Sequence, residues 1–214
     1  MIKPRLAVIG AGKLGITLAQ LAIQAGYSVS ISGSGDPDRI KLSTKILAPG
    51  ATVATTESSL STADVAILAL PLSSYTELKP EWFPEDIPVI DAMNYWWETD
   101  GKDEALASPS ASTSEIVQGH LAHSRVTKAL SHVGYHDLRD FSTQNGRLQP
   151  IGVALAGPSQ DRPTIESIIS NLGFEPYYLG ELSEGKRLEP GSPVFGAHLT
   201  KEQLVTVLAN ESSS

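Results

Sequence analysis

The sequence predicts an α/β fold in which a doubly wound, mostly parallel sheet is covered by helices. A short apolar run, Arg5–Ile9, is followed by a glycine-rich turn and by a helical pattern over Lys13–Gln24. Near-continuous apolar runs then alternate with helical patterns along the chain. Such runs are typical of parallel strands that are buried on both faces.

The N-terminal half continues this alternation of strands and helices. Tyr27–Ser32 has the alternating pattern of a strand, and Asp38–Leu47 follows Pro37 as a helix, because proline is favoured in a first helical turn. Further strands are expected at Ala51–Ala54, Asp64–Leu70 and Pro88–Ala92.

The C-terminal half begins with a polar stretch, Glu98–Ser114, which we expect to be a surface connection or flap. Ser112 and Glu115 have the spacing of a capping box, so a helix should run to about Ala122. We interpret the later strands as an extension of the same sheet. The remaining expected elements are strands at Arg125–Leu130, Gly152–Ala156 and Glu175–Leu179, a helix at Arg162–Leu172, a short helix capped by Thr200 and Gln203, and a frayed tail at Asn210–Ser214.

Composition limits the organisation and the partners. The 214 residues, 41% of them hydrophobic, suffice for one buried core, so we expect a single domain. A net charge of -8 disfavours nucleic acid as a partner. Because no apolar run approaches the roughly 20 residues of a membrane span and the start lacks a secretion signal, we expect a cytoplasmic protein without a membrane partner. With no cysteine and five scattered histidines, we expect no metal site.

The glycine string Gly10-Ala11-Gly12-Lys13-Leu14-Gly15 lies where the first strand gives way to the first helix. Gly10 permits a tight turn, Gly12 leaves bare backbone for a pyrophosphate, and Gly15 lets the helix pack close to the strand. Free amides at the helix start would face the phosphates. The string predicts a Rossmann-type pocket for a nicotinamide cofactor over residues 1–97, with 98–214 as the sheet extension and the wall of a second substrate. The alternative is a glycine-rich turn that binds nothing.

The end of the second strand decides between the two nicotinamide cofactors, because an NAD enzyme usually places a carboxylate there against the ribose 2′-hydroxyl. This chain has Ser32 at that place and continues with Gly33-Ser34, whose hydroxyl and amides suit a 2′-phosphate. Arg39 or Lys41 on the next helix would add positive charge. The sequence therefore favours NADP(H). The alternative is that Asp36 holds a ribose diol instead.

Four stretches of the chain resemble one family of enzymes. They are the opening GAGKLG string, ALPLSS at Ala69–Ser74, VIDAMN at Val89–Asn94 and RVTKALSHVGYHDL at Arg125–Leu138. Together they resemble the NADPH-dependent reductases of the deazaflavin coenzyme, which pair a D-x-x-N turn after the fifth strand with a V-K-A-F-N-like strand. The architecture is also similar to that of the cytosolic reductase domains of membrane metalloreductases.

The resemblance implies where an NADP(H) molecule would lie. By that resemblance the pyrophosphate would contact Gly10–Leu14, and the 2′-phosphate would contact Ser32, Ser34 and Arg39. The adenosine side would contact Leu70, Pro71 and Leu72. The nicotinamide end would contact Met93, Asn94 and Ser131. Two departures weaken the detail. The family has serine then arginine where this chain has Ser34-Gly35. The family has asparagine where this chain has Ser131.

The expected chemistry is hydride transfer between the nicotinamide ring and a second planar ring, such as a deazaflavin or flavin, about 3 to 3.5 Å away. The task of the protein is then placement, which suits a chain with no evident triad or thiol. Asn94, Ser131 and His132 are the candidate catalytic residues. His132 would polarise the acceptor or donate a proton, or it is a structural histidine.

Aromatic residues border the expected nicotinamide end. Tyr95-Trp96-Trp97 follows Asn94 directly and either stacks on a ligand ring or packs in the core or a subunit interface. Trp82 and Phe83 are expected in the core. The segment Leu188–Phe195 resembles the closing loop of the family and would wall the pocket of the second ring.

Three functional classes stay open at this point. The first is an NADP-dependent reductase of a small-molecule redox acceptor such as a deazaflavin or flavin. The second is a dehydrogenase of a small metabolite, although such relatives usually add a long helical segment that is not visible here. The third is a non-catalytic NADP sensor or scaffold, which the Ser131 departure and the lack of a clear acid or base favour. A homodimer is expected only by precedent.

Overall fold

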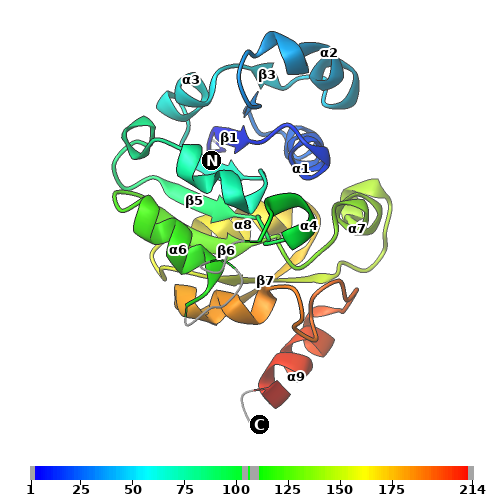
Figure 1. The fold of residues 1–214 in the computed structure, drawn as a ribbon. Coiled ribbons are helices and arrows are strands. Elements are labelled where there is room, and N and C mark those ends of the chain that lie inside the picture. Colours follow the sequence, from blue (N-terminus) through cyan, green and yellow to red (C-terminus); the bar gives the residue numbers. More distant parts are fainter. Residues whose placement is uncertain (1–2, 103–105, 107–110, 212–214) are drawn as a thin grey trace.

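A single mixed sheet runs through the middle of the molecule (Figure 1). The computed structural model describes residues 3–102, 106 and 111–211. Within them eight strands pair in the order β3-β2-β1-β4-β5-β6-β7-β8. The pairs from β3 to β6 are parallel, β6 and β7 are antiparallel, and β7 and β8 are parallel again. This confirms the predicted doubly wound, mostly parallel sheet with C-terminal strands added.

The strands are short and mostly buried. Val8 on β1 lies opposite Ile31 on one side and Ile67 on the other, so the carboxyl ends of β1, β2 and β4 meet at one edge. β5 and β6 continue that edge because they are parallel to β4. The strands are β1 (Leu6–Ile9), β2 (Val29–Ser32), β3 (Thr52–Val53), β4 (Val65–Leu68), β5 (Pro88–Asp91), β6 (Arg125–Ala129), β7 (Gly152–Ala156) and β8 (Glu175–Gly180).

The helices connect these strands and cover the sheet. The Ser112–Glu115 capping box forms as predicted, and Thr200 and Gln203 bond each other's backbone amides at the start of the last helix. The α-helices are α1 (Lys13–Gln24), α2 (Asp38–Leu47), α3 (Thr56–Ser61), α4 (Trp97–Asp100), α6 (Thr113–His120), α7 (Tyr135–Phe141), α8 (Arg162–Asn171) and α9 (Lys201–Glu211); the 3-10 helices are η1 (Leu72–Glu77), η2 (Pro80–Trp82), η3 (Thr143–Asn145) and η4 (Leu182–Leu188).

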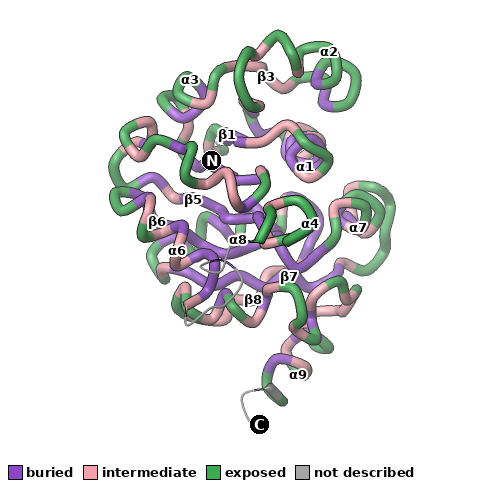
Figure 2. The backbone as a smooth tube through the Cα atoms, in the orientation of Figure 1, coloured by how far each residue is buried: buried purple, intermediate pink, exposed green. Residues whose placement is uncertain are grey.

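Alternate residues of each strand face opposite layers of the core. On β1, Leu6 and Val8 pack with α1, α7 and α8, whereas Ala7 and Ile9 pack with α3, η1 and α6. A smaller cluster joins β7 to η4 and α9. Figure 2 shows the buried strands at the centre and the exposed backbone mainly on the outer turns of the helices. Both faces of the sheet are therefore covered, and its carboxyl edge is left for a ligand.

Three short α-helices, α3, α4 and α7, were not predicted from the sequence, because none of them carries a long apolar stripe. α4 lies at the start of the stretch expected as a surface connection, and residues 103–105 and 107–110 of that stretch lie outside the described residues. The frayed tail expected at Asn210–Ser214 is wrong for its first two residues, since α9 continues to Glu211. The last three residues of that tail also lie outside the described residues.

None of the helices in the described part of the chain combines the length and the apolar character needed to cross a membrane.

Candidate functional site

Two glycines of the string are required by close contacts between backbone segments. Gly10 has a φ of +117°, and a β-carbon there would lie 2.2 Å from the carbonyl oxygen of Ala69. A β-carbon at Gly15 would lie 1.8 Å from the carbonyl oxygen of Gly10. These positions let α1 start close against the ends of β1 and β4.

Gly12 is different, because no heavy atom of the described residues lies within 4 Å of the place where its β-carbon would stand. It is the N-cap of α1 and is exposed, and no side chain caps the helix there. The first amides of an α-helix have no partner within the helix, and the helix dipole adds partial positive charge. The start of α1 therefore offers bare donors to an anion.

A cavity of about 520 Å³ opens in front of this turn, a size typical of small-molecule sites. It lies at the carboxyl ends of β1, β2 and β4, where the strand order reverses and where ligands bind in open α/β sheets. Seven predicted cofactor residues line it: Gly10, Ala11, Gly12, Gly33, Ser34, Leu70 and Pro71. The other lining residues are Ile9, Gly35, Ile40, Thr56, Ala69, Ser74, Glu77, Leu78 and Trp82.

Other predicted cofactor residues lie outside the lining of this cavity. Lys13 is exposed, with its ammonium 5.5 Å from the centre of the Tyr135 ring, and Leu14 is partly buried against the core. Ser32 is fully buried, and its hydroxyl accepts a hydrogen bond from Thr56 at 3.1 Å. Leu72 is also fully buried in the core. The structure therefore brings neither Ser32 nor Leu72 to the cavity, because core packing holds both side chains inward.

The turn after β2 is the end of the cavity that would meet a 2′-phosphate. Ser34 is exposed and lines the cavity, and the guanidinium of Arg39 lies 3.7 Å from the place of a β-carbon at Gly35. One oxygen of the Asp36 carboxylate accepts the backbone amide of Asp38 at the start of α2 at 2.9 Å. The carboxylate that would favour a free ribose diol thus already holds one backbone amide.

Trp82, expected in the core, packs partly against it and also lines the cavity. Its ring is half-buried, and the ammonium of Lys79 lies 5.2 Å from the ring centre. Phe83 beside it is buried as expected. Because a short 3-10 helix follows no simple apolar period, the pattern of residues does not indicate which of the two aromatics faces the cavity.

The ends of β5 and β6 meet further along the same edge. Asn94, three residues beyond the end of β5, donates from its Nδ2 to the carbonyl oxygen of Ser131 at 2.7 Å. Among the described residues, the buried atoms Asn94 Oδ1 and Ser131 Oγ have no hydrogen-bond partner. Unpaired buried polar groups are costly, and these two lie at the carboxyl ends of β5 and β6, beyond the residues that line the 520 Å³ cavity. Met93 is buried, with its carbonyl turned to Lys128.

Leu130, the residue before Ser131, has a φ of +63° in the left-handed region. Its side chain is fully buried, so this residue does not lie in an exposed turn. A non-glycine residue in this region costs about 1 to 3 kcal/mol and tends to mark functional sites. This turn lies directly before Ser131, whose carbonyl accepts the bond from Asn94.

His132 is a core residue. Its ring is 1% exposed, and Nε2 accepts the backbone amide of Ala154 at 3.0 Å. Burial lowers the pKa of His132 from 6.5 to about 4, so the imidazole is neutral near pH 7. Nε2 is already occupied by a backbone amide, and the ring has almost no contact with solvent. Both observations favour a structural role for His132 over a catalytic one.

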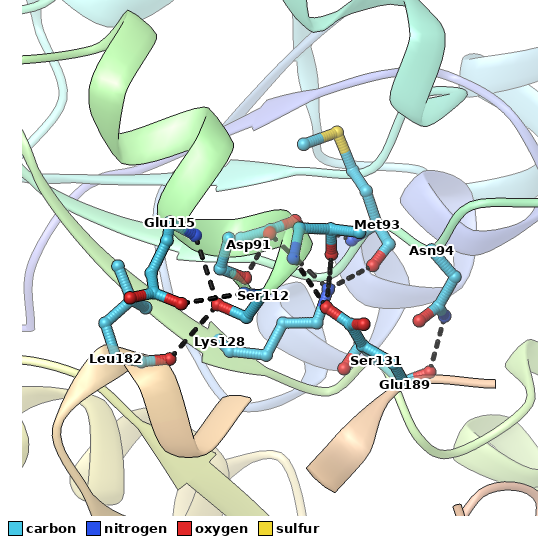
Figure 3. Close-up of polar contacts among 11 residues, drawn as sticks. Asp91, Met93, Asn94, Ser112, Glu115, Lys128, Ser131, Leu182 and Glu189 are labelled. Carbon is cyan, nitrogen blue, oxygen red and sulfur yellow. Dashed lines mark hydrogen bonds and ion pairs between the residues drawn. The ribbon is translucent and has the colours of Figure 1, made fainter. Parts of the chain in front are cut away.

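Asp91 and Lys128 form an ion pair that was not predicted from the sequence. Both side chains are fully buried, with Lys128 Nζ 3.5 Å from Asp91 Oδ2. Figure 3 shows Lys128 pointing toward Asp91 and Met93, with Asn94 and Ser131 to one side. A lysine within a strand pattern suggests a solvent-facing residue, whereas here an acidic partner 37 positions away compensates the buried charge.

The aromatic run lies next to Asn94 at the carboxyl edge. Trp96 and Trp97 are exposed, and the ring of Trp96 meets Phe195 edge to face at 5.6 Å. Asp100 fixes this loop, because its carboxylate accepts the amides of both Ser73 and Trp96. The loop is thereby joined to η1, which lines the cavity.

Comparisons with known proteins bear on the first part of the chain most directly. Residues 5–95 match the model of the family described as "NADP oxidoreductase coenzyme F420-dependent". The match confirms the resemblance over β1 to β5 and the Asp91–Asn94 turn, whereas the resembling stretch Arg125–Leu138 lies beyond it. No curated protein matches the chain.

Solved structures share the fold over most of the chain. The hypothetical protein SMa0349 from Sinorhizobium meliloti is 26% identical, with 92% of this chain and 95% of that chain covered and a TM-score of 0.79. A protein from Arthrobacter sp. FB24, to which F420-dependent NADP-reductase activity is ascribed, is 17% identical, covers 86% and 87%, and has a TM-score of 0.72. The 3-hydroxyisobutyrate dehydrogenase of Mycobacterium tuberculosis is 13% identical; the match covers 86% of this chain but 57% of the dehydrogenase, with a TM-score of 0.62.

Proposed function

We propose that the protein binds NADP(H) along the carboxyl edge of its sheet and transfers hydride between NADPH and a planar ring acceptor such as a deazaflavin or flavin. The observation that carries the proposal is the turn at Gly12, where bare backbone faces a cavity of about 520 Å³. The match of residues 5–95 to a family of NADP oxidoreductases supports the same cofactor.

The residues present fit a dinucleotide with a 2′-phosphate. The amides at the start of α1 suit the pyrophosphate, and Ser34 with the nearby guanidinium of Arg39 suits the 2′-phosphate. The carboxylate of Asp36 is already bonded to the amide of Asp38. Trp82 and Leu70, in the same lining, offer apolar surface for the adenine.

The nicotinamide end is assigned to Asn94 and Ser131. The sheet order places β5 three strands from β2, about 14 Å along the edge, so only an extended ligand would reach both ends. Asn94 Oδ1 and Ser131 Oγ, which lack partners among the described residues, would bond a carboxamide and set the face of the ring. When bound, NADPH supplies the hydride, and the side chains need only orient and exclude water.

The acceptor ring is assigned to the exposed aromatic surface beside Asn94. Trp96 and Phe195 come from two different loops and meet edge to face, which makes one wall of apolar surface. Such a wall suits a flat ring more than a small hydroxy or imino acid, which would call for a charged or strongly polar partner.

The test is an acceptor screen that follows NADPH oxidation by absorbance. Deazaflavin, flavins, quinones and ferric chelates are offered in turn, with NADH in place of NADPH as the control. Turnover with a deazaflavin or flavin, faster with NADPH than with NADH, is expected. Tight NADPH binding without turnover of any acceptor would contradict hydride transfer and favour a sensor or scaffold.

A further inference from the structure

Lys128 is a charged residue with no exposed surface in the middle of the sheet. Its partner Asp91, at the end of β5, is equally buried. Removing two charges from water costs several kcal/mol per ion, and a buried pair rarely stabilises a fold more than apolar residues of the same size. The stability of the fold alone therefore gives no reason for this pair, and the partners of its polar atoms indicate another role.

The pair holds the backbone of Met93 at both of its polar groups (Figure 3). Lys128 Nζ donates to the carbonyl oxygen of Met93 at 2.6 Å, its shortest contact. Asp91 Oδ1 accepts the backbone amide of Met93 at 2.9 Å. The other carboxylate oxygen of Asp91 accepts the hydroxyl of Ser114 at 2.5 Å. Both backbone polar groups of Met93 are thus fixed by buried charges.

The Met93 carbonyl belongs to the peptide bond whose nitrogen is that of Asn94. When the oxygen of this peptide is fixed, the plane of the peptide and hence the direction of the Asn94 side chain are restricted. Asn94 then makes its 2.7 Å bond to Ser131 across the ends of β5 and β6. A bond from Lys128 therefore acts on Asn94 without any contact between the two side chains.

The same ammonium reaches the loop on the other side of the site. It lies 3.4 Å from Thr113 Oγ1, and this hydroxyl donates to Glu189 Oε1 at 2.8 Å. Glu189 also accepts the backbone amide of Thr113, and it begins the loop that ends with Phe195 beside Trp96. One buried charge thus joins the Asn94 turn to the loop that would wall the acceptor.

We propose that Lys128 is a positioning residue for the nicotinamide end of the site. Its ammonium fixes the Met93–Asn94 peptide, and the fixed Asn94 holds a nicotinamide ring in one orientation. The role is indirect, because Asp91, Met93 and Thr113 surround the ammonium and Gly185 packs against the side-chain stem. This inference rests on the proposed function.

The informative variant removes both charges together. Lys128→Met alone would leave the Asp91 carboxylate buried without its partner, which destabilises a fold by itself. In the double variant Asp91→Asn/Lys128→Met, the side-chain oxygen of the new asparagine can still accept the Met93 amide, and methionine fills most of the lysine volume. The double variant has the same net charge as the parent; it lacks the ion pair and the lysine bonds to the Met93 carbonyl and Thr113, and the Ser114 hydroxyl meets an amide nitrogen in place of a carboxylate oxygen.

Two readouts separate positioning from folding. Hydrogen exchange without ligand should be at least about tenfold faster for the amides of residues 92–97 and unchanged for those of β1. Affinity for NADPH should fall at least about tenfold, whereas 2′-phospho-ADP-ribose, which lacks the nicotinamide, should bind within about twofold of the parent. Unchanged exchange at residues 92–97, or equal losses for both ligands, overturns the proposal.

A chemical rescue keeps the test decisive if the double variant does not fold. The chain has no cysteine, so Lys128→Cys carries a unique thiol that can be aminoethylated in urea before refolding. The restored ammonium should recover NADPH affinity, whereas a neutral alkyl group of similar length should not; equal recovery overturns the proposal. A parent protein that binds neither ligand contradicts the proposed function, while the exchange result tests Lys128 separately.

Discussion

Asn94 Nδ2 donates to the carbonyl oxygen of Ser131 at 2.7 Å and so joins the carboxyl ends of β5 and β6. The two residues are 37 positions apart and approach only because the strands are parallel neighbours. Each also carries a buried oxygen, Asn94 Oδ1 and Ser131 Oγ, without a partner among the described residues. The contact therefore joins the two strand ends, and in the proposed function the two unpaired oxygens bind the nicotinamide carboxamide.

Removing the Asn94 side chain should weaken the hold on the nicotinamide end and leave binding of the 2′-phosphate end intact. Asn94→Ala loses the bond to Ser131 and one ligand atom, so kcat/KM for NADPH oxidation should fall about tenfold or more. Ser131→Ala keeps the carbonyl acceptor and should cost less, about two- to fivefold. Steady-state kinetics with the best acceptor of the screen, together with 2′-phospho-ADP-ribose titrations, checks this. If both variants lost affinity for 2′-phospho-ADP-ribose, the assignment of this end to nicotinamide would be wrong.

Ser34 should govern the choice between the two cofactors. Ser34→Asp places a carboxylate where a 2′-phosphate would bind, so NADPH affinity should fall about tenfold or more while NADH affinity changes less than about threefold. Ser43→Asp adds the same charge on α2 outside the cavity lining and is the matched control. Titration of each variant with both nucleotides measures the effect. Equal losses for NADPH and NADH would count against a 2′-phosphate site at this turn.

Two tryptophans should affect two different ligands. Trp96→Ala removes half of the aromatic wall formed with Phe195, so KM for a ring acceptor should rise about fivefold or more while the Kd for NADPH stays nearly unchanged. Trp82→Ala lies in the cavity lining and should weaken NADPH binding instead. Kinetics and NADPH titrations on both variants give the comparison. The same pattern of losses in the two variants would refute the assignment of the two ends.

Burial of His132 should make the fold sensitive to acid. Its pKa is lowered from 6.5 to about 4 in the native state, so below about pH 6.5 the unfolded chain binds a proton that the folded chain excludes. The free energy of unfolding should therefore fall by about 3 kcal/mol between pH 6.5 and pH 4, with no contribution from this group above about pH 7.

Urea unfolding across this pH range measures that contribution by comparison of variants. His132→Gln keeps an acceptor for the Ala154 amide but does not titrate, so its stability should depend less on pH than that of the parent. His123→Gln, at an exposed position, is the control and should follow the parent. Parallel pH profiles for the parent and His132→Gln would contradict the buried neutral imidazole.

Local patterns in the sequence were sufficient for the frame of the fold and for the phosphate end of the site. The glycine string could be interpreted because each glycine has a backbone role. The apolar runs could be interpreted because a strand buried on both faces is apolar throughout and does not alternate with polar residues. The short helices α3 and α7 could not be found in this way. α3 is a six-residue helix held by the cap of Thr55 on Ser58, and such a helix has too few turns to show a period.

The rest of the site depends on contacts between distant segments, which one sequence does not reveal. Lys128 resembles an outward-facing residue of a strand until its bond to Met93, 35 positions away, is known. Ser32 and Leu72 carry the expected residue types for a ligand, but packing against Thr56 and the core turns them inward. Residue type and spacing predicted which segments meet, whereas the direction of single side chains was decided by tertiary packing.

The most direct measurement is an equilibrium titration of the parent protein and Gly12→Ala with NADPH, followed by nicotinamide fluorescence. The added methyl group meets no atom within 4 Å in the part of the chain that the structure describes, so the melting temperature should fall by no more than about 4 °C, the effect of a poorer N-cap. NADPH affinity should fall at least about tenfold, because the methyl occupies the approach of the pyrophosphate. Binding of neither NADPH nor NADH to the parent, or equal NADPH affinity in the parent and Gly12→Ala, would contradict a pyrophosphate site at this turn.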